Sequence, residues 1–442
     1  MPRLARSALA LTLVAVLVSS VALTASAQHT PFTIQADADL QVALAALYGA
    51  RYEGAEPTFV AEGGDLLATT DAEVVAGVYE GLPAHFLPDA MLVPLTENAE
   101  AAAFVRFAVS ADGQAALIDA GLLPDSVTVI DQGGNEVTLA QPVRRILTPY
   151  AITTHTVYTV GAQDRFAAAN FLGTAGQAGE NMARIDPRSR EISSVMQMSQ
   201  REINVEDVAA LQPDVILTST RTAWIDAVRE LGIPFVLYEG ETPEALKEAM
   251  LLTGQFLGPD AAARAEAWVA YYERIFNHIS EQTGALSDDE RVPVLFTGTE
   301  PLRVASGDMY QTAMIAAAGG VSVSAGLVGF WNDVNLEQVL IWNPQVIFMP
   351  SYGGASVEAI TESEEWQALD AVRAGRVYQL PQFSAPLDTP LPDSVLGIVW
   401  MAQILYPDLV GLDCAAEAQY FYKTWYSYDM TEDEAATLCA TP

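Results

Sequence analysis

The side chains best suited to ligand chemistry in this chain are aromatic rings and hydroxyls, accompanied by one arginine. Aromatic faces suit a flat or apolar ligand, while a guanidinium can pair bidentately with a carboxylate or an oxyanion. His155 could ligate a metal ion or simply form a hydrogen bond, and Arg221 could equally be a surface residue at a helix start. Trp331 and Tyr352 could face a ligand or pack in the core. The candidate ligand-binding residues are Tyr150, His155, Arg221, Tyr310, Trp331 and Tyr352.

Two other kinds of site lack candidates. A bare zinc or manganese site needs several histidines and carboxylates that converge, but the chain has only 4 histidines, which are spread along it. No nucleophilic triad, phosphate-binding glycine loop or catalytic carboxylate pair is evident. We therefore expect neither a free transition-metal site, nor a cofactor, nor an enzyme.

The candidate residues follow segments that we predict to be strands of parallel sheets. In open α/β sheets, ligands bind beyond the carboxyl ends of the strands. Helical segments alternate with these strands, and one long helical segment, 259–285, begins at a proline suited to a first helical turn. The sequence thus predicts two α/β lobes joined by one helix, with the ligand between them. The predicted strands include 144–147, 214–218, 234–238, 292–296 and 376–380.

A motif that occurs twice also indicates two lobes. Residues 204–217 (NVEDVAALQPDVIL) and 335–348 (NLEQVLIWNPQVIF) begin 131 residues apart and are identical at 6 of 14 positions. In each copy an asparagine can cap a short helix, and a proline ends that helix just before an apolar strand. Each copy also carries a glutamate at the helix start, Glu206 or Glu337, where the helix dipole favours it.

Charge and length limit the class of protein. The chain has 442 residues, which predicts two or three domains. It carries 56 acidic and 21 basic residues, for a net charge of −35. Such a surface argues against nucleic acid or anionic lipid as a partner and favours a soluble monomer. It also disfavours anionic ligands, unless a local basic pocket outweighs the overall charge.

The first residues have the pattern of an export signal. A basic start and an apolar run over 8–23 precede the small-residue sequence Ala-Ser-Ala at 25–27. We expect a signal peptide over 1–27 and a mature chain that begins at Gln28, in the periplasm or another extracytoplasmic space. An uncleaved membrane anchor is the alternative.

The two cysteines lie close together near the end of the chain. If the chain is exported, Cys414 and Cys439 lie in a compartment in which disulfides persist. A bridge between them would join the C-terminal helices and contribute about 3 kcal/mol in the chain-entropy model. Two free buried thiols are the alternative.

Residues 31–124 are predicted to form a separate small α/β unit. FTIQADADLQVAL from residue 32 and FVRFAVSADGQAALIDAGLLP at 104–124 resemble the type II solute-binding proteins, the molybdate- and tungstate-binding group in particular. The resemblance implies one of the two lobes of such a protein. That family binds oxyanions with hydroxyls in early loops, whereas the matching positions here are Ala36, Asp37, Gly63 and Gly64. We therefore expect a structural or interaction role for this unit.

Motifs over 126–442 resemble the type III periplasmic binding proteins, which serve ABC importers of iron–siderophore, haem and cobalamin. Besides the two repeats, they include VTVIDQGGNEVTL at 127–139, WQALDAVRAGRVY at 366–378 and LGIVWMAQILYP at 396–407. The resemblance implies lobes at 126–258 and 290–442, bridged by the rigid helix 259–285. It further implies a small-molecule metal chelate as ligand and an ABC permease as partner. In that family a surface glutamate on each lobe contacts permease arginines, a role that falls here to Glu206 and Glu337.

The leading hypothesis is therefore an extracytoplasmic receptor that delivers a metal chelate to an ABC importer. Within that class, molybdate or tungstate is the alternative ligand. Two alternatives lie outside the class of transport receptors: a metal-insertion protein and a scaffold that has lost its ligand.

Overall fold

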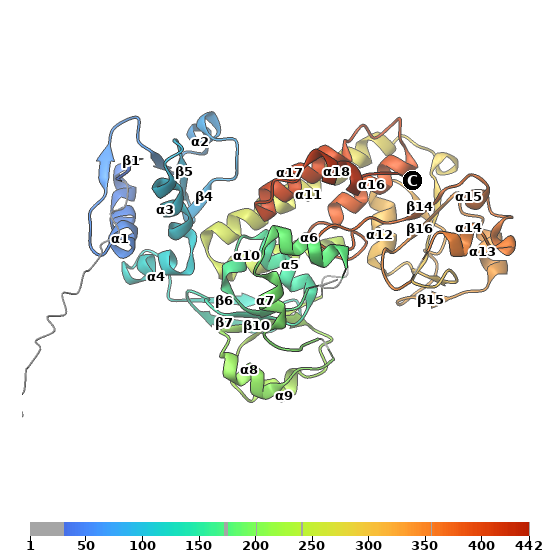
Figure 1. The fold of residues 1–442 in the computed structure, drawn as a ribbon, viewed down its shortest axis with the longest axis horizontal. Coiled ribbons are helices and arrows are strands. Elements are labelled where there is room, and N and C mark those ends of the chain that lie inside the picture. The colour runs from blue at the N-terminus through green and yellow to red at the C-terminus, as the bar shows by residue number, and fades with distance from the viewer. Residues whose placement is uncertain (1–30, 172–175, 200, 240–241, 355, 442) are drawn as a thin grey trace, which may run out of the picture.

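The computed structural model describes residues 31–171, 176–199, 201–239, 242–354 and 356–441. A small N-terminal α/β unit lies beside a larger body, which consists of two α/β lobes and the helices that join them (Figure 1). The predicted fold class is confirmed, because each lobe contains a parallel sheet flanked by helices. The expected signal peptide, 1–27, lies outside the described residues.

The N-terminal unit is built on a five-stranded sheet of order β2-β1-β3-β5-β4. The first three of these strands are parallel, and β5 is antiparallel to both of its neighbours. Helices α1, α3 and α4 pack on one face of the sheet, and α2 packs on the other through Val75. The bounds are β1 Thr33–Ala36, α1 Gln41–Arg51, β2 Thr58–Val60, β3 Leu66–Thr69, α2 Ala72–Val78, β4 Ala84–Leu87, β5 Ala90–Pro94, α3 Ala99–Val109 and α4 Ala111–Asp119.

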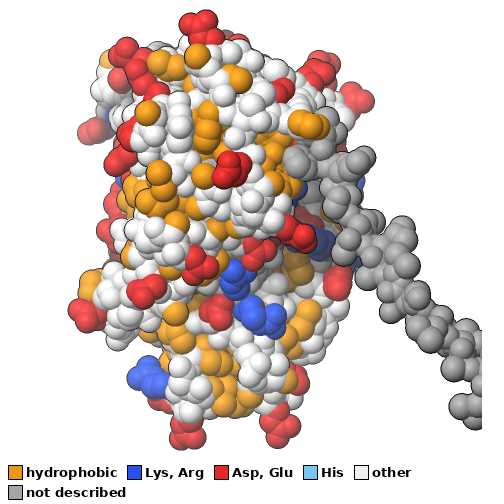
Figure 2. Space-filling view, turned by 90° about the vertical axis from the view of Figure 1, so that its left-hand side faces the viewer, with side chains coloured by type: hydrophobic (Ala, Val, Ile, Leu, Met, Phe, Trp, Pro, Cys, Tyr) orange, Lys and Arg blue, Asp and Glu red, His pale blue; other side chains and the backbone are white. Residues whose placement is uncertain are grey.

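The outward side of this unit carries many acidic and apolar side chains and few basic ones (Figure 2). Among the described residues, no single helix has the length and apolar character needed to cross a membrane, and only the pair α3 and α4, bent by 68°, meets both criteria together.

The two lobes share one strand topology. Their sheets are β11-β10-β8-β9 and β14-β12-β16-β17, and all neighbouring strands are parallel. Each sheet places the strand of the repeated motif, β10 or β16, directly beside the first strand of its lobe, β8 or β12. The bounds are β8 Ile146–Thr148, β9 Phe166–Ala169, β10 Val215–Ser219 and β11 Phe235–Tyr238 in the first lobe, and β12 Pro293–Phe296, β14 Val321–Ser322, β16 Val346–Met349 and β17 Val377–Gln379 in the second.

The repeated motif folds the same way twice, as α8 (Val205–Leu211) and α13 (Leu336–Trp342). The side chain of Asn204 accepts hydrogen bonds from two backbone N–H groups of α8, and Asn335 accepts one in α13. Each helix ends at a residue in the left-handed conformation, with φ of 47° at position 212 and 42° at position 343. The following proline disfavours a right-handed helical residue before it, so both copies leave the helix at the same point.

The predicted long helix is α11 (Pro259–Thr283), about 37 Å long at 1.5 Å per residue. One continuous apolar core runs from Val215 in the first lobe through Trp268 of α11 to Phe348 in the second. Helix α16 (Ser394–Leu405) packs on the second lobe and α17 (Cys414–Tyr426) on the first, so the C-terminal segment makes a further connection.

The predicted disulfide is present. It joins Cys414, at the start of α17, to Cys439, just after α18 (Glu432–Leu438), with 5.8 Å between the two Cα atoms.

The remaining elements lie mostly around the lobes. They are the β6–β7 hairpin (Ser126–Ile130 and Glu136–Ala140), α5 Ala151–Thr159, α6 Gln177–Ile185, α7 Ser189–Ser194, α9 Ile225–Arg229, α10 Pro243–Leu257, β13 Arg303–Val304, α12 Tyr310–Ala317, β15 Asn332–Asp333, α14 Glu358–Thr361 and α15 Asp370–Arg373.

Candidate functional site

The strand orders point to one place in each lobe. Ligands of open α/β sheets bind where the strand order reverses, in the crevice outside the carboxyl ends of the strands. The strands that flank this crevice are β8 and β10 in the first lobe and β12 and β16 in the second. Tyr150 and Arg221 follow the first pair of strands, and Thr297 and Tyr352 follow the second.

Arg221 extends from the loop after β10 toward the second lobe. Its guanidinium carbon lies 5.1 Å from the centroid of the Phe330 ring, which belongs to the second lobe. Both residues are exposed, and Phe330 remains 56% accessible. A cation–π contact at such a site contributes about 0.5–1 kcal/mol. The pair therefore connects the lobes at a solvent-accessible edge of the cleft.

Tyr150 makes a second contact between the lobes. It precedes α5 and packs with Ile152 against Ala385 and Leu391, which follow β17 in the second lobe. Ala385 and Leu391 are fully buried, so this contact lies deeper than the one at Arg221.

Helix α6 of the first lobe provides a third contact. The Asn181 side-chain Nδ2 donates to the backbone oxygen of Phe383 at 3.1 Å, and the Arg184 guanidinium carbon lies 5.9 Å from the Phe383 ring centroid. These residues line a cavity of about 500 Å³ between α6, the loop after β17 and α18. Arg184 also pairs with Glu434 of α18.

Tyr352 lies over a buried carboxylate. Its hydroxyl donates to Oδ2 of Asp388 at 3.0 Å, and Asp388 is 0% exposed. Burial raises the pKa of Asp388 to about 6, partly offset by hydrogen bonds from Tyr352 and Gln311. The Gln311 amide nitrogen donates to the backbone oxygen of Asp388 at 2.9 Å.

Several buried polar atoms at this edge of the second sheet have no hydrogen-bond partner among the described residues. They lie at the ends of β12 and β16, on α12 and after β17. Buried polar groups are nearly always paired, and leaving one unpaired costs about 1–3 kcal/mol. A ligand that hydrogen-bonds here would recover that cost. The atoms are Thr297 Oγ1, Gln311 Oε1, Ser351 Oγ and Asp388 Oδ1.

Trp331 covers the loop that follows β12. Its ring lies 6.4 Å from that of Phe296, and a Cβ added at Gly298 would come within 3.1 Å of it. Nearby, a Cβ at Gly353 would lie 2.2 Å from Thr299 Cγ2, and Gly353 has a φ of +72°. Glycine at position 353 therefore lets the loops after β12 and β16 approach each other.

Two predicted cleft residues lie in the core instead. His155 is 0% exposed, and all nine residues of its helix, α5, are buried. Its Nδ1 is 3.0 Å from the hydroxyl of Tyr426 on α17. Tyr310 is 1% exposed, and its hydroxyl is 2.6 Å from Ser394 Oγ on α16. The prediction that they face a ligand is wrong, because C-terminal helices cover both.

Sequence reasoning missed Phe330 and Asp388. Its position next to Trp331, a candidate ligand-binding residue, was a usable signal for Phe330. Nothing in the local sequence signals Asp388, whose burial depends on the packing of distant segments. In the described part of the chain, no group of three or more His, Cys, Asp or Glu side chains is arranged to hold a metal ion.

Parts of the chain are similar in sequence to known proteins. Residues 178–383 match the family described as periplasmic binding protein. The molybdate-binding protein MolA of Haemophilus influenzae is 25% identical over 333 residues, which cover 68% of this chain and 92% of MolA. A vitamin B12-binding protein of Yersinia pestis is 25% identical over 218 residues, 47% of this chain and 70% of that protein.

Solved structures show the same fold. A periplasmic solute-binding protein from Veillonella parvula has a TM-score of 0.61 at 24% identity, over 71% of this chain and 96% of its own. The structure of MolA bound to molybdate has a TM-score of 0.60 at 22% identity, over 69% of this chain and 99% of its own. The two-lobed body therefore has the fold of periplasmic binding proteins, and residues 178–383 carry the match to the family of that name.

Proposed function

We propose that this chain is the extracytoplasmic substrate-binding receptor of an ABC importer and that it captures its ligand between the two lobes. The observation that carries the proposal is the contact of Arg221 with Phe330, since it brings the carboxyl edge of the first sheet to the second lobe. The relatives support it, because they are binding proteins of the same fold.

The proposed ligand is a metal chelate of the iron–siderophore, haem or cobalamin class. Tyr150, Trp331, Tyr352 and Phe330 supply aromatic surface for a large ligand, and Arg221 supplies a charged donor. The relative named as a vitamin B12-binding protein supports this class. The buried carboxylate of Asp388 would suit a ligand that donates hydrogen bonds.

Molybdate or tungstate is the second candidate, and the relationship to MolA favours it. An oxyanion could be held by Arg221 with the hydroxyls of Thr297 and Ser351. The Asp388 carboxylate opposes an anion when it is ionised, so binding of molybdate would strengthen below about pH 6, where that group is protonated.

The N-terminal unit is proposed to have a structural role. At the carboxyl end of β1, Asp37 Oδ2 accepts a hydrogen bond from Thr69 Oγ1 at 2.8 Å. Asp71, after β3, accepts hydrogen bonds from two N–H groups at the start of α2. Carboxylates at this edge take up the donors that an oxyanion would need, so the sheet edge is poorly suited to molybdate.

Ligand-dependent thermal unfolding tests the proposal. The panel is molybdate, tungstate, cyanocobalamin, haem and a ferric siderophore, with sulfate as the control oxyanion. A ligand at about 100 times its Kd should raise Tm by about 3 °C. A shift with a chelate supports the first ligand class, and a shift with molybdate but not sulfate supports the second. If no member of the panel raises Tm, the receptor proposal fails, and a scaffold or metal-insertion role becomes the better explanation.

The proposal includes docking to a permease through Glu206 and Glu337. Both are exposed and occupy the second position of the repeated helices, one on each lobe. Equivalent positions in the two lobes allow one partner to contact both.

A further inference from the structure

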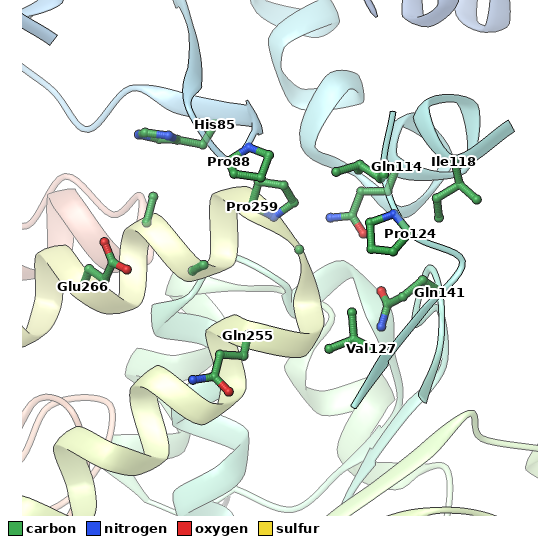
Figure 3. A pocket seen from close by; sticks show the side chains of 14 residues that line it. His85, Pro88, Gln114, Ile118, Pro124, Val127, Gln141, Gln255, Pro259 and Glu266 are labelled. Carbon is green, nitrogen blue, oxygen red and sulfur yellow. The ribbon is translucent and has the colours of Figure 1, made fainter. Parts of the chain in front are cut away.

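A groove lies where the N-terminal unit meets the first lobe and the start of α11 (Figure 3). Its volume is about 320 Å³, near the lower end of the ~300–1,000 Å³ typical of ligand pockets. It shares no lining residue with the interlobe cleft. Its walls come from β4 and α4 on one side, the β6–β7 hairpin on another, and the junction of α10 with α11.

The frame of the groove is fixed by contacts between the two units. The Gln114 side-chain amide of α4 donates to the backbone oxygen of Leu257, the last residue of α10, at 2.9 Å. This approach requires glycine at position 258, because a Cβ there would lie 2.1 Å from Gln114 Nε2. On the other side, the backbone N–H of His85 donates to Asp260 Oδ1 at 3.0 Å. The groove is therefore preformed.

One face of α11 forms the floor. Pro259, Ala262, Ala263 and Glu266 recur at the three- and four-residue spacing that places side chains on the same side of a helix. The floor is thus small and apolar along its first turns and ends at a carboxylate. Further apolar walls are Pro88, Ile118, Leu123, Pro124 and Val127.

The polar groups of the groove indicate what it would bind. Of its lining residues, Glu266 alone has a formal charge at neutral pH with histidine neutral, and no lysine or arginine is among them. His85 Nδ1 is buried without a hydrogen-bond partner among the described residues. Figure 3 shows the His85 and Glu266 side chains beside the same stretch of α11. An apolar molecule with a protonated amine would match the apolar walls and the Glu266 carboxylate.

We propose that this groove is a second small-molecule site, which takes an apolar organic cation such as an arylalkylammonium. The apolar body lies on Ala262 and Ala263, and the ammonium donates to Glu266. A cation is proposed because its charge complements that of Glu266. The acidic surface of the protein also raises the local concentration of cations. The site is independent of the function proposed for the cleft.

Calorimetric titration of the mature chain with 2-phenylethylammonium tests the proposal, with 3-phenylpropionate as a ligand of similar shape and opposite charge. We expect saturable binding of the cation at one site and none of the anion. Ala263→Leu fills the groove with a good helix former and should weaken binding at least tenfold. Glu266→Gln should weaken it several-fold.

Glu281→Gln is the matched control, because Glu281 is an exposed glutamate of the same helix outside the groove. It should bind like the unmodified chain, and unchanged Tm values should show that the variants are folded. Absence of saturable binding by the unmodified chain overturns the proposal, as does equal binding by Ala263→Leu. Equal binding of phenylpropionate would overturn the assigned ligand class.

Discussion

The guanidinium carbon of Arg221, in the first lobe, lies 5.1 Å from the centroid of the Phe330 ring in the second. A similar pair, Arg184 of α6 with Phe383, spans 5.9 Å. In both pairs the first lobe supplies the arginine and the second supplies the phenylalanine. The two lobes are thus held at a short separation by side chains that border the candidate cleft, while the shared core along α11 limits their relative motion.

The first prediction concerns Arg221. If the guanidinium contacts the ligand, Arg221→Ala should weaken ligand affinity by about tenfold to a hundredfold, since hydrogen bonds to charged groups contribute about 1.5–3 kcal/mol. Phe330→Ala, which removes only the stacking partner, should have a smaller effect. Calorimetry with the ligand identified in the panel measures both. Arg229→Ala removes an exposed arginine of the same lobe and should leave affinity unchanged. Equal affinities of the Arg221 and Arg229 variants would remove Arg221 from the site.

The second prediction concerns the repeated glutamates. Glu206→Ala combined with Glu337→Ala should leave ligand affinity intact and lower transport, because both side chains are exposed on helices that precede β10 and β16 and neither belongs to the loops that follow these strands. Reconstituted transport in vesicles measures the effect. The control pair is Glu230→Ala with Glu365→Ala, which changes the charge by the same amount, one exposed glutamate per lobe. Transport that falls equally in both double variants would point to net charge rather than docking.

The third prediction concerns Asp393, which is 0% exposed at the start of α16. Ser384 Oγ and the Tyr422 hydroxyl donate to its Oδ2 at 2.6 and 3.0 Å. Burial nevertheless raises its pKa from 3.8 to about 6. A carboxyl group with a raised folded-state pKa contributes stability that is full below 3.8 and is lost as pH rises through about 6. The loss is on the order of 2–3 kcal/mol.

Asp393→Asn should therefore remove this dependence. Relative to the unmodified chain, the variant should have a higher free energy of unfolding, and so be more stable, at neutral pH than at pH 4, as measured by urea unfolding. His155 has the opposite effect on the pH dependence of stability. Burial lowers its pKa from 6.5 to about 4, so its contribution to stability is lost as pH falls through about 4. Asp388 acts in the same direction as Asp393. If Asp393→Asn leaves the pH profile of the parent chain unchanged, then Asp393 is not a buried ionisable group.

The lobes could be predicted from sequence because their signals are local. The asparagine caps and prolines of the repeat act within a few residues, and both copies form the expected helix and strand. His155 and Tyr310 were misplaced because their burial depends on α17 and α16, which come much later in the chain. A loop position after a strand predicts proximity to a cleft, but only the packing of distant helices decides which side chains reach it.

The last prediction concerns the junction of the two units at Gly258. Its φ of +107° and ψ of 177° are accessible almost only to glycine, and its missing Cβ leaves room for Gln114. Gly258→Ala should therefore lower the free energy of unfolding by about 2 kcal/mol or more, through strain and through the clash with Gln114. Adding Gln114→Ala removes the clash and should recover part of the loss, although the strain remains and the Leu257 oxygen loses its donor. Urea unfolding of both single variants and the double variant measures this coupling.

Gly375→Ala is the control, since its φ is +66° but nothing lies within 4 Å of the added Cβ. If the Gly258 and Gly375 variants are equally stable, and Gln114→Ala recovers nothing, then α4 does not contact the α10–α11 corner as closely as the structure places it.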